Sequence, residues 1–147
     1  NTFDLIIMTG NAFQVLLHEA DVQAVFEVMA KHLKSDGRIA FETRNPTLDW
    51  SRNWNYQVDL ETPSGVVTES RHCSTWDGTH MTFELLYRFP DDEFVSKSEL
   101  RFWIPEKIDA CARSSGLCIE RLMGDWDFKD LDPKTSKEMV FFLRKSS

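Results

Sequence analysis

The spacing of apolar residues changes along this chain, and each change predicts a different element. Residues 3–8 are almost continuously apolar, which is typical of a strand covered on both faces in a parallel sheet. Between residues 22 and 33 the apolar positions recur every three or four residues, which predicts an amphipathic helix. Gly37 is expected to end this helix in the left-handed conformation, and residues 39–41 resume a strand. A strand, a helix and a strand in this order predict a right-handed crossover between parallel strands.

From residue 49 to 104 the apolar positions alternate with polar ones, as in half-buried strands. The pattern predicts four strands, over residues 56–60, 66–76, 79–89 and 95–104. Pro63-Ser64-Gly65 and Asp77-Gly78 supply the first two turns, and Asp77-Gly78 is the stronger hairpin signal. One face of the third strand is apolar, so this antiparallel meander has to cover another surface.

After the meander the pattern returns to a helix and two strands. Pro105 suits the first turn of a helix, and Gly116 is placed to end it. Residues 117–124 indicate a strand, and residues 139–143 indicate a fully buried one. Residues 125–137 between them are expected to form a polar surface connection.

Two segments carry a resemblance to a known family: Phe3-Asp4-Leu5 with Thr9-Gly10-Asn11-Ala12-Phe13, and Leu33-Lys34-Ser35-Asp36-Gly37-Arg38. They resemble the fourth strand, the following helix and the fifth strand of class I S-adenosylmethionine-dependent methyltransferases. Ser35 and Asp36 stand where that family usually has a proline and its first glycine. The order of the later elements also fits, so the resemblance covers nearly all 147 residues and favours small-molecule members with an antiparallel insertion.

The resemblance implies an α/β fold, a Rossmann-like methyltransferase domain that is incomplete. Residues 1–147 would form a single partial domain with strand order 4-5-7-6, the last strand being inserted antiparallel between its neighbours. The meander, about residues 49–104, would be a lid over the carboxyl ends of the parallel strands that closes the pocket for the methyl acceptor. The sequence has no Gly-x-Gly turn for the cofactor. The chain is therefore expected to be the C-terminal part of a longer enzyme, and to bind cofactor poorly and be inactive alone.

The cofactor implied by the resemblance is S-adenosyl-L-methionine, which would lie at the carboxyl end of the first strand. The residues there are Met8, Thr9, Gly10, Asn11 and Phe13. Gly10 permits a close approach of the backbone to a ligand. Asn11 has an alternative role as the cap of a short helix, and Phe13 has one as a core residue.

Residues that follow the second parallel strand are the candidates for binding the acceptor: Arg44, Asn45, Trp50, Trp54 and Tyr56. Arg44 would either hold a carboxylate or phosphate of the acceptor or form an ion pair with Glu42 or Asp49. Trp50 and Trp54 would either form one aromatic wall of the pocket or pack beneath the lid.

Methyl transfer often needs one base, and the histidines are the first residues to consider. His18, near the cofactor end, is the candidate that the sequence offers, and its alternative role is a polar residue at a helix start. His72, Cys73 and His80 flank the Asp77-Gly78 turn, but a fourth ligand at a recognisable spacing is missing. No metal site is therefore predicted.

Composition and charge limit the partners. A net charge of −7, without a cluster of Lys and Arg, argues against nucleic acid. No apolar run approaches the roughly twenty residues of a membrane helix, and three cysteines without paired spacing favour a reducing cytoplasm. The expected partner is a small-molecule methyl acceptor, with the exposed sheet edge or the lid as the surface for a homo-oligomer. The rival hypothesis is a noncatalytic α/β module that binds a ligand or a partner.

Overall fold

The structure is a computed structural model that describes residues 1–146. The chain divides into two compact units, one made of Asn1–Leu48 with Arg101–Ser147 and the other of Asp49–Leu100. We call the first the α/β unit and the second the meander unit.

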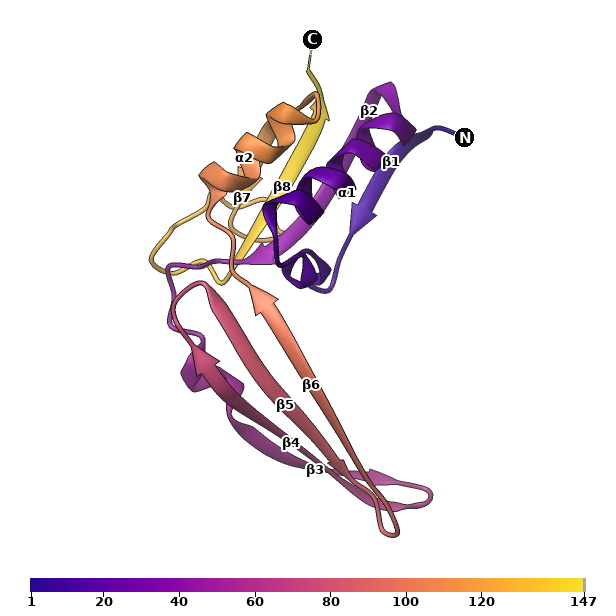
Figure 1. The fold of residues 1–147 in the computed structure, drawn as a ribbon, viewed down its shortest axis with the longest axis vertical. Helices are drawn as coiled ribbons and strands as arrows, with labels where there is room; N and C mark the ends of the chain where they lie inside the picture. Colours follow the sequence, from indigo (N-terminus) through magenta and orange to yellow (C-terminus); the bar gives the residue numbers. More distant parts are fainter. Residues whose placement is uncertain (147) are drawn as a thin grey trace. The chain divides into compact units, whose positions relative to one another are not determined.

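The α/β unit contains a four-stranded sheet and two α-helices (Figure 1). In chain order its elements are β1 (Phe3–Met8), the 3-10 helix η1 (Ala12–Val15), α1 (Glu19–His32), β2 (Leu33–Arg44), α2 (Pro105–Ser114), β7 (Leu117–Met123) and β8 (Glu138–Lys145). The strand order is β1-β2-β8-β7, with β1 parallel to β2 and β8 antiparallel to both of its neighbours. This confirms the predicted order and the antiparallel insertion of the last strand.

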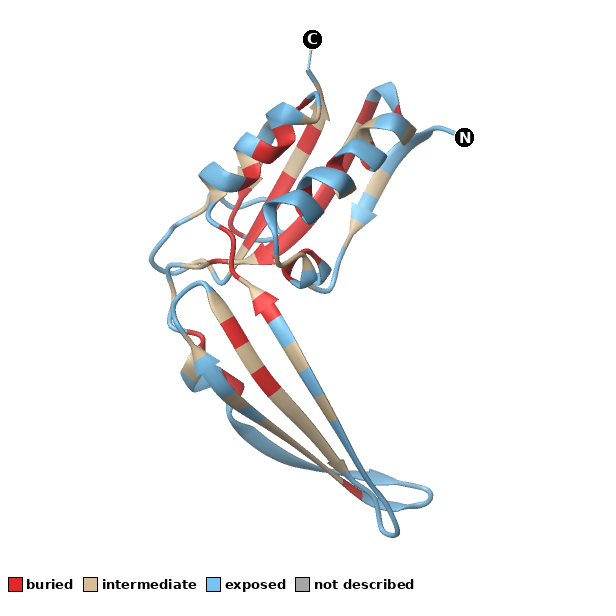
Figure 2. Cartoon of the chain, viewed as in Figure 1, coloured by how far each residue is buried: buried red, intermediate tan, exposed pale blue. Residues whose placement is uncertain are grey.

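Both helices lie on one face of this sheet, where the core of the unit is buried (Figures 1 and 2). Phe26 of α1 and Ile108 of α2 are completely buried in it. Phe41 of β2 lies between two further aromatic rings, with centroid distances of 4.5 Å to Phe13 and 5.0 Å to Phe141. These stacked rings fix β2 against its surroundings and so hold its carboxyl end in place.

β1 is the edge strand of the sheet, and one of its faces is exposed. Phe3, Leu5 and Ile7 have 49%, 56% and 61% of their surface exposed, whereas Ile6 and Met8 pack against the core. The expectation of a strand covered on both faces is wrong for the chain as described, because the helices cover only one of them.

Gly37 does not end the first helix. That helix ends at His32, and Gly37 lies inside β2 without a positive φ. A Cβ atom on Gly37 would come within 2.8 Å of Cδ1 of Leu33 and 3.0 Å of the carbonyl oxygen of Phe3. The glycine therefore serves the close approach of β1 to β2, near the point where their register shifts, and the predicted left-handed stop is wrong.

The meander unit contains a second sheet, of order β3-β4-β5-β6, whose first three strands pair antiparallel. Its elements are the 3-10 helix η2 (Ser51–Trp54), β3 (Tyr56–Thr62), β4 (Gly65–Trp76), β5 (His80–Arg88) and β6 (Glu93–Arg101). The four strands agree with the prediction, although the last ends at Arg101 instead of residue 104. At the predicted Asp77-Gly78 turn, the carboxylate of Asp77 accepts hydrogen bonds from the backbone N–H groups of His80 and Thr79, at 2.6 and 2.7 Å. These bonds lower the pKa of Asp77 to about 2.

Candidate functional site

The carboxyl ends of β1 and β2 and the start of β8 carry a group of interacting polar side chains. We call this group the strand-end cluster: Asn11, Gln14, Glu42, Arg44, Glu138 and the indole of Trp126. Glu42 is buried, with 6% of its surface exposed. Its Oε1 accepts a hydrogen bond from the backbone N–H of Asn11 at 2.9 Å, and its Oε2 accepts one from Nε1 of Trp126 at 2.8 Å. Through these two hydrogen bonds, Glu42 connects the loop after β1 and the loop after β7 to the end of β2.

Glu138, the first residue of β8, is a second carboxyl group in the cluster. Its Oε1 accepts a hydrogen bond from Nδ2 of Asn11 at 3.5 Å, whereas its Oε2 is buried and has no hydrogen-bond partner in the part of the chain that is described. Burial raises the pKa of Glu138, and this effect outweighs the opposing influence of the Arg44 charge and the Asn11 hydrogen bond. Glu138 therefore binds a proton more readily than an exposed glutamate, which suits a general base.

Asn11 contributes a second buried oxygen that lacks a hydrogen-bond donor. It precedes η1 with a φ of 57°, and its side chain makes no capping hydrogen bond to that helix. Asn11 therefore occupies the cap position, where its backbone carbonyl accepts a hydrogen bond from the N–H of Gln14 at 3.1 Å, but its side chain does not cap the helix. Its Oδ1 is buried and, like Oε2 of Glu138, has no donor within the described residues. Buried polar atoms are normally hydrogen-bonded, so two such oxygens at the carboxyl ends of strands indicate a place for a ligand.

Arg44 is held by a buried glutamine. Its Nη1 donates a hydrogen bond to Oε1 of Gln14 at 2.6 Å, and Nε2 of Gln14 donates one to the carbonyl oxygen of Arg101 at 3.4 Å. Gln14 has no exposed surface, so this series of bonds fixes the position of the guanidinium. Asp49, one of the two acids considered as a partner for Arg44, forms an ion pair with Arg52 at 3.7 Å.

Phe13 belongs to the core. Only 1% of its surface is exposed, and its ring is stacked on that of Phe41. Its expected contact with the cofactor is wrong, because the core already covers the side chain, and the alternative interpretation is confirmed. Of the other residues expected near the cofactor, Met8 is partly buried against the core, whereas Thr9 and Gly10 are exposed at the end of β1.

Asn45 is a structural residue and not an acceptor contact. It is buried, with 2% of its surface exposed. Its Nδ2 donates hydrogen bonds to the carbonyl oxygens of Pro133 and Ser136, at 3.0 and 2.8 Å. Its Oδ1 accepts bonds from the backbone N–H and the hydroxyl of Thr47, at 3.1 and 2.9 Å. Because these bonds occupy both ends of the amide, the expected role in binding the acceptor is wrong.

Replacing Asn45 with alanine is expected to lower the free energy of unfolding by about 2–4 kcal/mol, because several buried bonds are lost and their partners are left unpaired. Chemical denaturation of the full-length protein measures this loss. Asn53→Ala is the matched control, since Asn53 is exposed and should change stability by less than about 0.5 kcal/mol. Equal effects of the two substitutions would contradict the structural role of Asn45.

The other three residues expected to bind the acceptor belong to the meander unit. Trp50 and Trp54 have 8% and 4% of their surface exposed, and their rings meet edge to face at a centroid distance of 6.3 Å. Trp54 meets Phe83 of β5 in the same way at 5.4 Å. Packing within the meander is therefore the role that the structure shows for both tryptophans. Tyr56 is more exposed, and its hydroxyl donates a hydrogen bond to Glu69.

The histidines have structural explanations. His18 is exposed and precedes α1, and its backbone N–H donates a hydrogen bond to Asp21 at 3.1 Å, as at the start of many helices. This agrees with its alternative role at a helix start. His72 pairs with Glu84 across β4 and β5. Among the described residues, no group of three or more His, Cys, Asp or Glu side chains is arranged to hold a metal ion.

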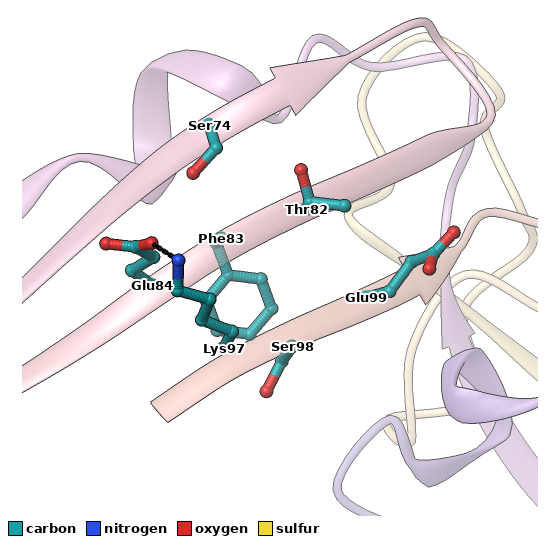
Figure 3. A pocket seen from close by; sticks show the side chains of 7 residues that line it. All are labelled: Ser74, Thr82, Phe83, Glu84, Lys97, Ser98 and Glu99. Atoms are coloured by element: carbon teal, nitrogen blue, oxygen red, sulfur yellow. Dashed lines mark ion pairs between the residues drawn. The ribbon is translucent and has the colours of Figure 1, made fainter. Parts of the chain in front are cut away.

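The meander unit also has a polar hollow of about 460 Å³, whose lining side chains are drawn in Figure 3. Its lining consists of Ser74, Thr82, Phe83, Glu84, Lys97, Ser98 and Glu99. The ammonium group of Lys97 forms an ion pair with Glu84 at 2.7 Å. Because these two charges already bind each other, the hollow is a weaker candidate for ligand binding than the strand-end cluster.

Solved structures of methyltransferases share the fold of this chain. The chain superposes over 100% of its length on a S-adenosylmethionine-dependent methyltransferase from Clostridium acetobutylicum, with a TM-score of 0.82 and 16% identity, and covers 60% of that structure. It covers 59% of the CcbJ methyltransferase from Streptomyces caelestis, again over 100% of its own length, at a TM-score of 0.78 and 15% identity. The sugar N-methyltransferase KedS8 from Streptoalloteichus sp gives a TM-score of 0.73 and 15% identity, and 99% of this chain covers 57% of it.

These similarities show that the chain has the α/β, Rossmann-like methyltransferase fold that its sequence resemblance implied. The chain spans about 60% of the length of the solved structures it matches. No protein-family model and no curated protein sequence match the chain.

Sequence reasoning named Asn11 and Arg44 as site residues and Glu42 as a possible partner of Arg44. It missed the other three members of the strand-end cluster: Gln14, Trp126 and Glu138. Trp126 lies in the segment expected to be only a polar surface connection, yet it reaches Glu42, 84 positions away in the chain. Glu138 stands immediately before the predicted buried strand of residues 139–143. Since that strand was expected to run antiparallel beside the second parallel strand, its first residue could have been placed at the carboxyl end of that neighbour.

Proposed function

We propose that this chain forms part of a S-adenosylmethionine-dependent methyltransferase that acts on a small molecule. The observation that carries the proposal is the strand-end cluster, in which two buried oxygens without donors lie where β1 ends and β8 begins. The methyltransferase fold supports the same location, because ligands of such sheets bind at the carboxyl ends of the parallel strands. A sugar N-methyltransferase and an amino pentose methyltransferase among the structural neighbours support a small-molecule acceptor.

S-adenosyl-L-methionine is the proposed cofactor, and Met8, Thr9, Gly10 and Asn11 are the residues that would hold it. The cofactor supplies an electrophilic methyl group on a sulfonium cation. The oxygens of Asn11 and Glu138 fit such a group, because the carboxylate of Glu138 attracts positive charge and the amide oxygen of Asn11 carries a partial negative charge. Gly10 has a φ of 73°, and no heavy atom lies within 4 Å of the position of a Cβ, so there is open space beside the backbone at this point.

Glu138 is the proposed proton acceptor. When an amine or a hydroxyl of the acceptor gains a methyl group, one proton has to leave the same nitrogen or oxygen atom. Oε2 of Glu138 has no partner in the described chain, and burial raises its pKa, so the carboxylate is suited to take that proton. Arg44, fixed by Gln14, would orient an anionic or hydrogen-bond-accepting group of the acceptor.

The proposal concerns the full-length protein. The chain spans about 60% of its structural neighbours, and its sequence lacks the Gly-x-Gly turn that approaches the cofactor in this family. We propose that residues outside these 147 bind the nucleoside part of the cofactor and that the chain alone is inactive. Its cysteines at positions 73, 111 and 118 are free, which supports a reducing compartment such as the cytoplasm. None of the described helices is both long enough and apolar enough to cross a membrane.

Calorimetric titration of the full-length protein with S-adenosyl-L-methionine tests the function. We expect saturable binding that S-adenosylhomocysteine competes for. Asn11→Ala should weaken this binding about tenfold, because one hydrogen-bonding side chain at the site is lost. The exposed Asn53→Ala variant should bind as the unchanged protein does.

Two results would contradict the proposal. A folded full-length protein that does not bind S-adenosyl-L-methionine would favour the noncatalytic binding module. Binding that is unchanged in Asn11→Ala would show that the strand-end cluster is not the cofactor site.

A further inference from the structure

Arg71 of β4 is a cation without a carboxylate partner. The other Arg and Lys side chains of the meander unit form ion pairs: Arg52 with Asp49 at 3.7 Å, Arg88 with Glu93 at 3.2 Å and Lys97 with Glu84 at 2.7 Å. Arg71 takes part in no ion pair and donates no hydrogen bond to any described residue, and its Nε is buried. A buried donor of this kind is costly to leave without an acceptor.

Three aromatic side chains surround the guanidinium of Arg71. Its central carbon lies 5.0 Å from the ring centroid of Tyr56, 5.3 Å from that of Trp54 and 5.5 Å from that of Phe83. Tyr56 is directly opposite Arg71 in the pairing of β3 with β4. Rings attract a guanidinium through its flat faces, whereas its N–H donors point outwards in its plane. The aromatic side chains therefore hold the cation in place without using its hydrogen-bond donors.

The carboxylate of Glu69, two residues away on the same strand, does not supply the missing acceptor. It accepts a hydrogen bond from the hydroxyl of Tyr56, and this bond is the largest influence that lowers the pKa of Glu69. The charge of Arg71 lowers this pKa further, but the two groups form no ion pair. The acid thus binds the hydroxyl of Tyr56, and the N–H donors of the Arg71 guanidinium form no hydrogen bond to it.

We propose that Arg71, with Tyr56, Trp54 and Phe83, is an anion-binding subsite for a carboxylate or phosphate group of a small molecule. Both groups present paired oxygen atoms that match the fork of N–H donors on a guanidinium. The protein has a net charge of −7, which disfavours the binding of a polyanion such as nucleic acid. We therefore expect the ligand of this subsite to be a small molecule whose anionic group binds Arg71 directly. This inference does not depend on methyl transfer.

Titration of the full-length protein with methyl phosphate and, separately, with acetate at constant ionic strength tests the subsite. The Nε–H signal of Arg71 and the backbone amide signals of Tyr56 and Phe83, followed by NMR, are expected to shift and saturate with at least one of the two compounds. Tighter binding of methyl phosphate identifies a phosphate ester as the natural group, and tighter binding of acetate identifies a carboxylate. The absence of saturable shifts with both compounds overturns the proposal.

Substitutions assign the effect to Arg71. Arg71→Gln is expected to weaken binding at least tenfold, as judged from the amide signals, because the charge and the fork are both lost. Arg71→Lys keeps the charge and the aliphatic stem but loses the fork of N–H donors. This variant is expected to fold and to bind the anion several times more weakly than the unchanged protein. Arg88→Gln is the matched control, since Arg88 is already paired with Glu93. Equal losses of affinity for the anion in Arg71→Gln and Arg88→Gln would overturn the proposal. The affinity for S-adenosyl-L-methionine is expected to be unchanged in Arg71→Gln, so the test of this subsite is separate from the test of the proposed function.

Discussion

Replacing Glu138 with glutamine is expected to lower kcat of the full-length enzyme about a hundredfold, the lower end of the usual contribution of a general base. The substitution keeps the shape of the side chain but removes its capacity to take a proton. The hydrogen bond from Asn11 Nδ2 to Oε1 can persist, because the amide oxygen of glutamine also accepts one. The affinity for S-adenosyl-L-methionine is therefore expected to change much less than kcat. Methyl-transfer assays with the natural acceptor, or with a panel of small amines and alcohols, measure the difference.

The stability of the same variant at different pH values tests the raised pKa of Glu138. Burial raises the pKa of Glu138 above its ordinary value of 4.5, so the folded protein binds this proton more tightly than the unfolded chain does. The carboxyl therefore costs no stability below pH 4.5, and its cost grows as the pH rises through the raised pKa. Glu138→Gln should be at least as stable as the unchanged protein at neutral pH, and it should lose this advantage below pH 4.5.

The catalytic profile should change in the same variant. In the unchanged enzyme kcat is expected to rise with pH as Glu138 ionises, and the rise should be absent from Glu138→Gln. Glu61→Gln, at an exposed position of β3, should behave like the unchanged enzyme in both respects. A Glu138→Gln enzyme with full kcat would exclude Glu138 as the proton acceptor.

Replacing Phe41 with alanine is expected to lower the free energy of unfolding by about 3–5 kcal/mol, which is the usual cost of removing a buried phenylalanine. The ring has no exposed surface and is stacked between Phe13 and Phe141. Its removal leaves a cavity in the centre of the core and ends both ring contacts. Because a typical domain is stable by only about 5–15 kcal/mol, this loss should be easy to measure by chemical denaturation.

Phe94→Ala is the control for this substitution. Phe94 lies on β6 with 59% of its surface exposed, so its loss should change stability by less than about 1 kcal/mol. A loss below about 2 kcal/mol in Phe41→Ala would show that the surrounding core collapses into the cavity, and that Phe41 is not the central support of β2 that its contacts indicate.

Most of the elements followed from local patterns. α2 begins at Pro105 and is followed by Gly116 with a φ of 74°, as predicted. The Asp77-Gly78 turn was also correct, since Gly78 has a φ of 92°. The error at Gly37 has a clear cause: a glycine can meet a need for a left-handed turn or for close packing, and only the position of Phe3 shows that packing is the reason here.

The candidate site was predicted less completely than the fold. Asn11 and Arg44 were expected because each follows a strand that could be recognised from its own neighbours in the sequence. Glu138 was missed because it contacts Asn11 across 127 positions of the chain, and no local pattern reports such a contact. For Asn45 and Phe13 the sequence did not show that internal partners occupy both side chains.

The amino-acid sequence by itself determined the kinds of element, their order and the turns between them, because periodicity and turn chemistry act over a few neighbouring residues. It also identified the methyltransferase-like crossover at residues 3–46. Only the tertiary structure decided which polar atoms are buried without a partner, as in Asn11 and Glu138, and which cation lacks an acid, as in Arg71. Those properties depend on long-range packing, since the solvent and the hydrogen-bond partners of a side chain are excluded or supplied by segments far away in the chain.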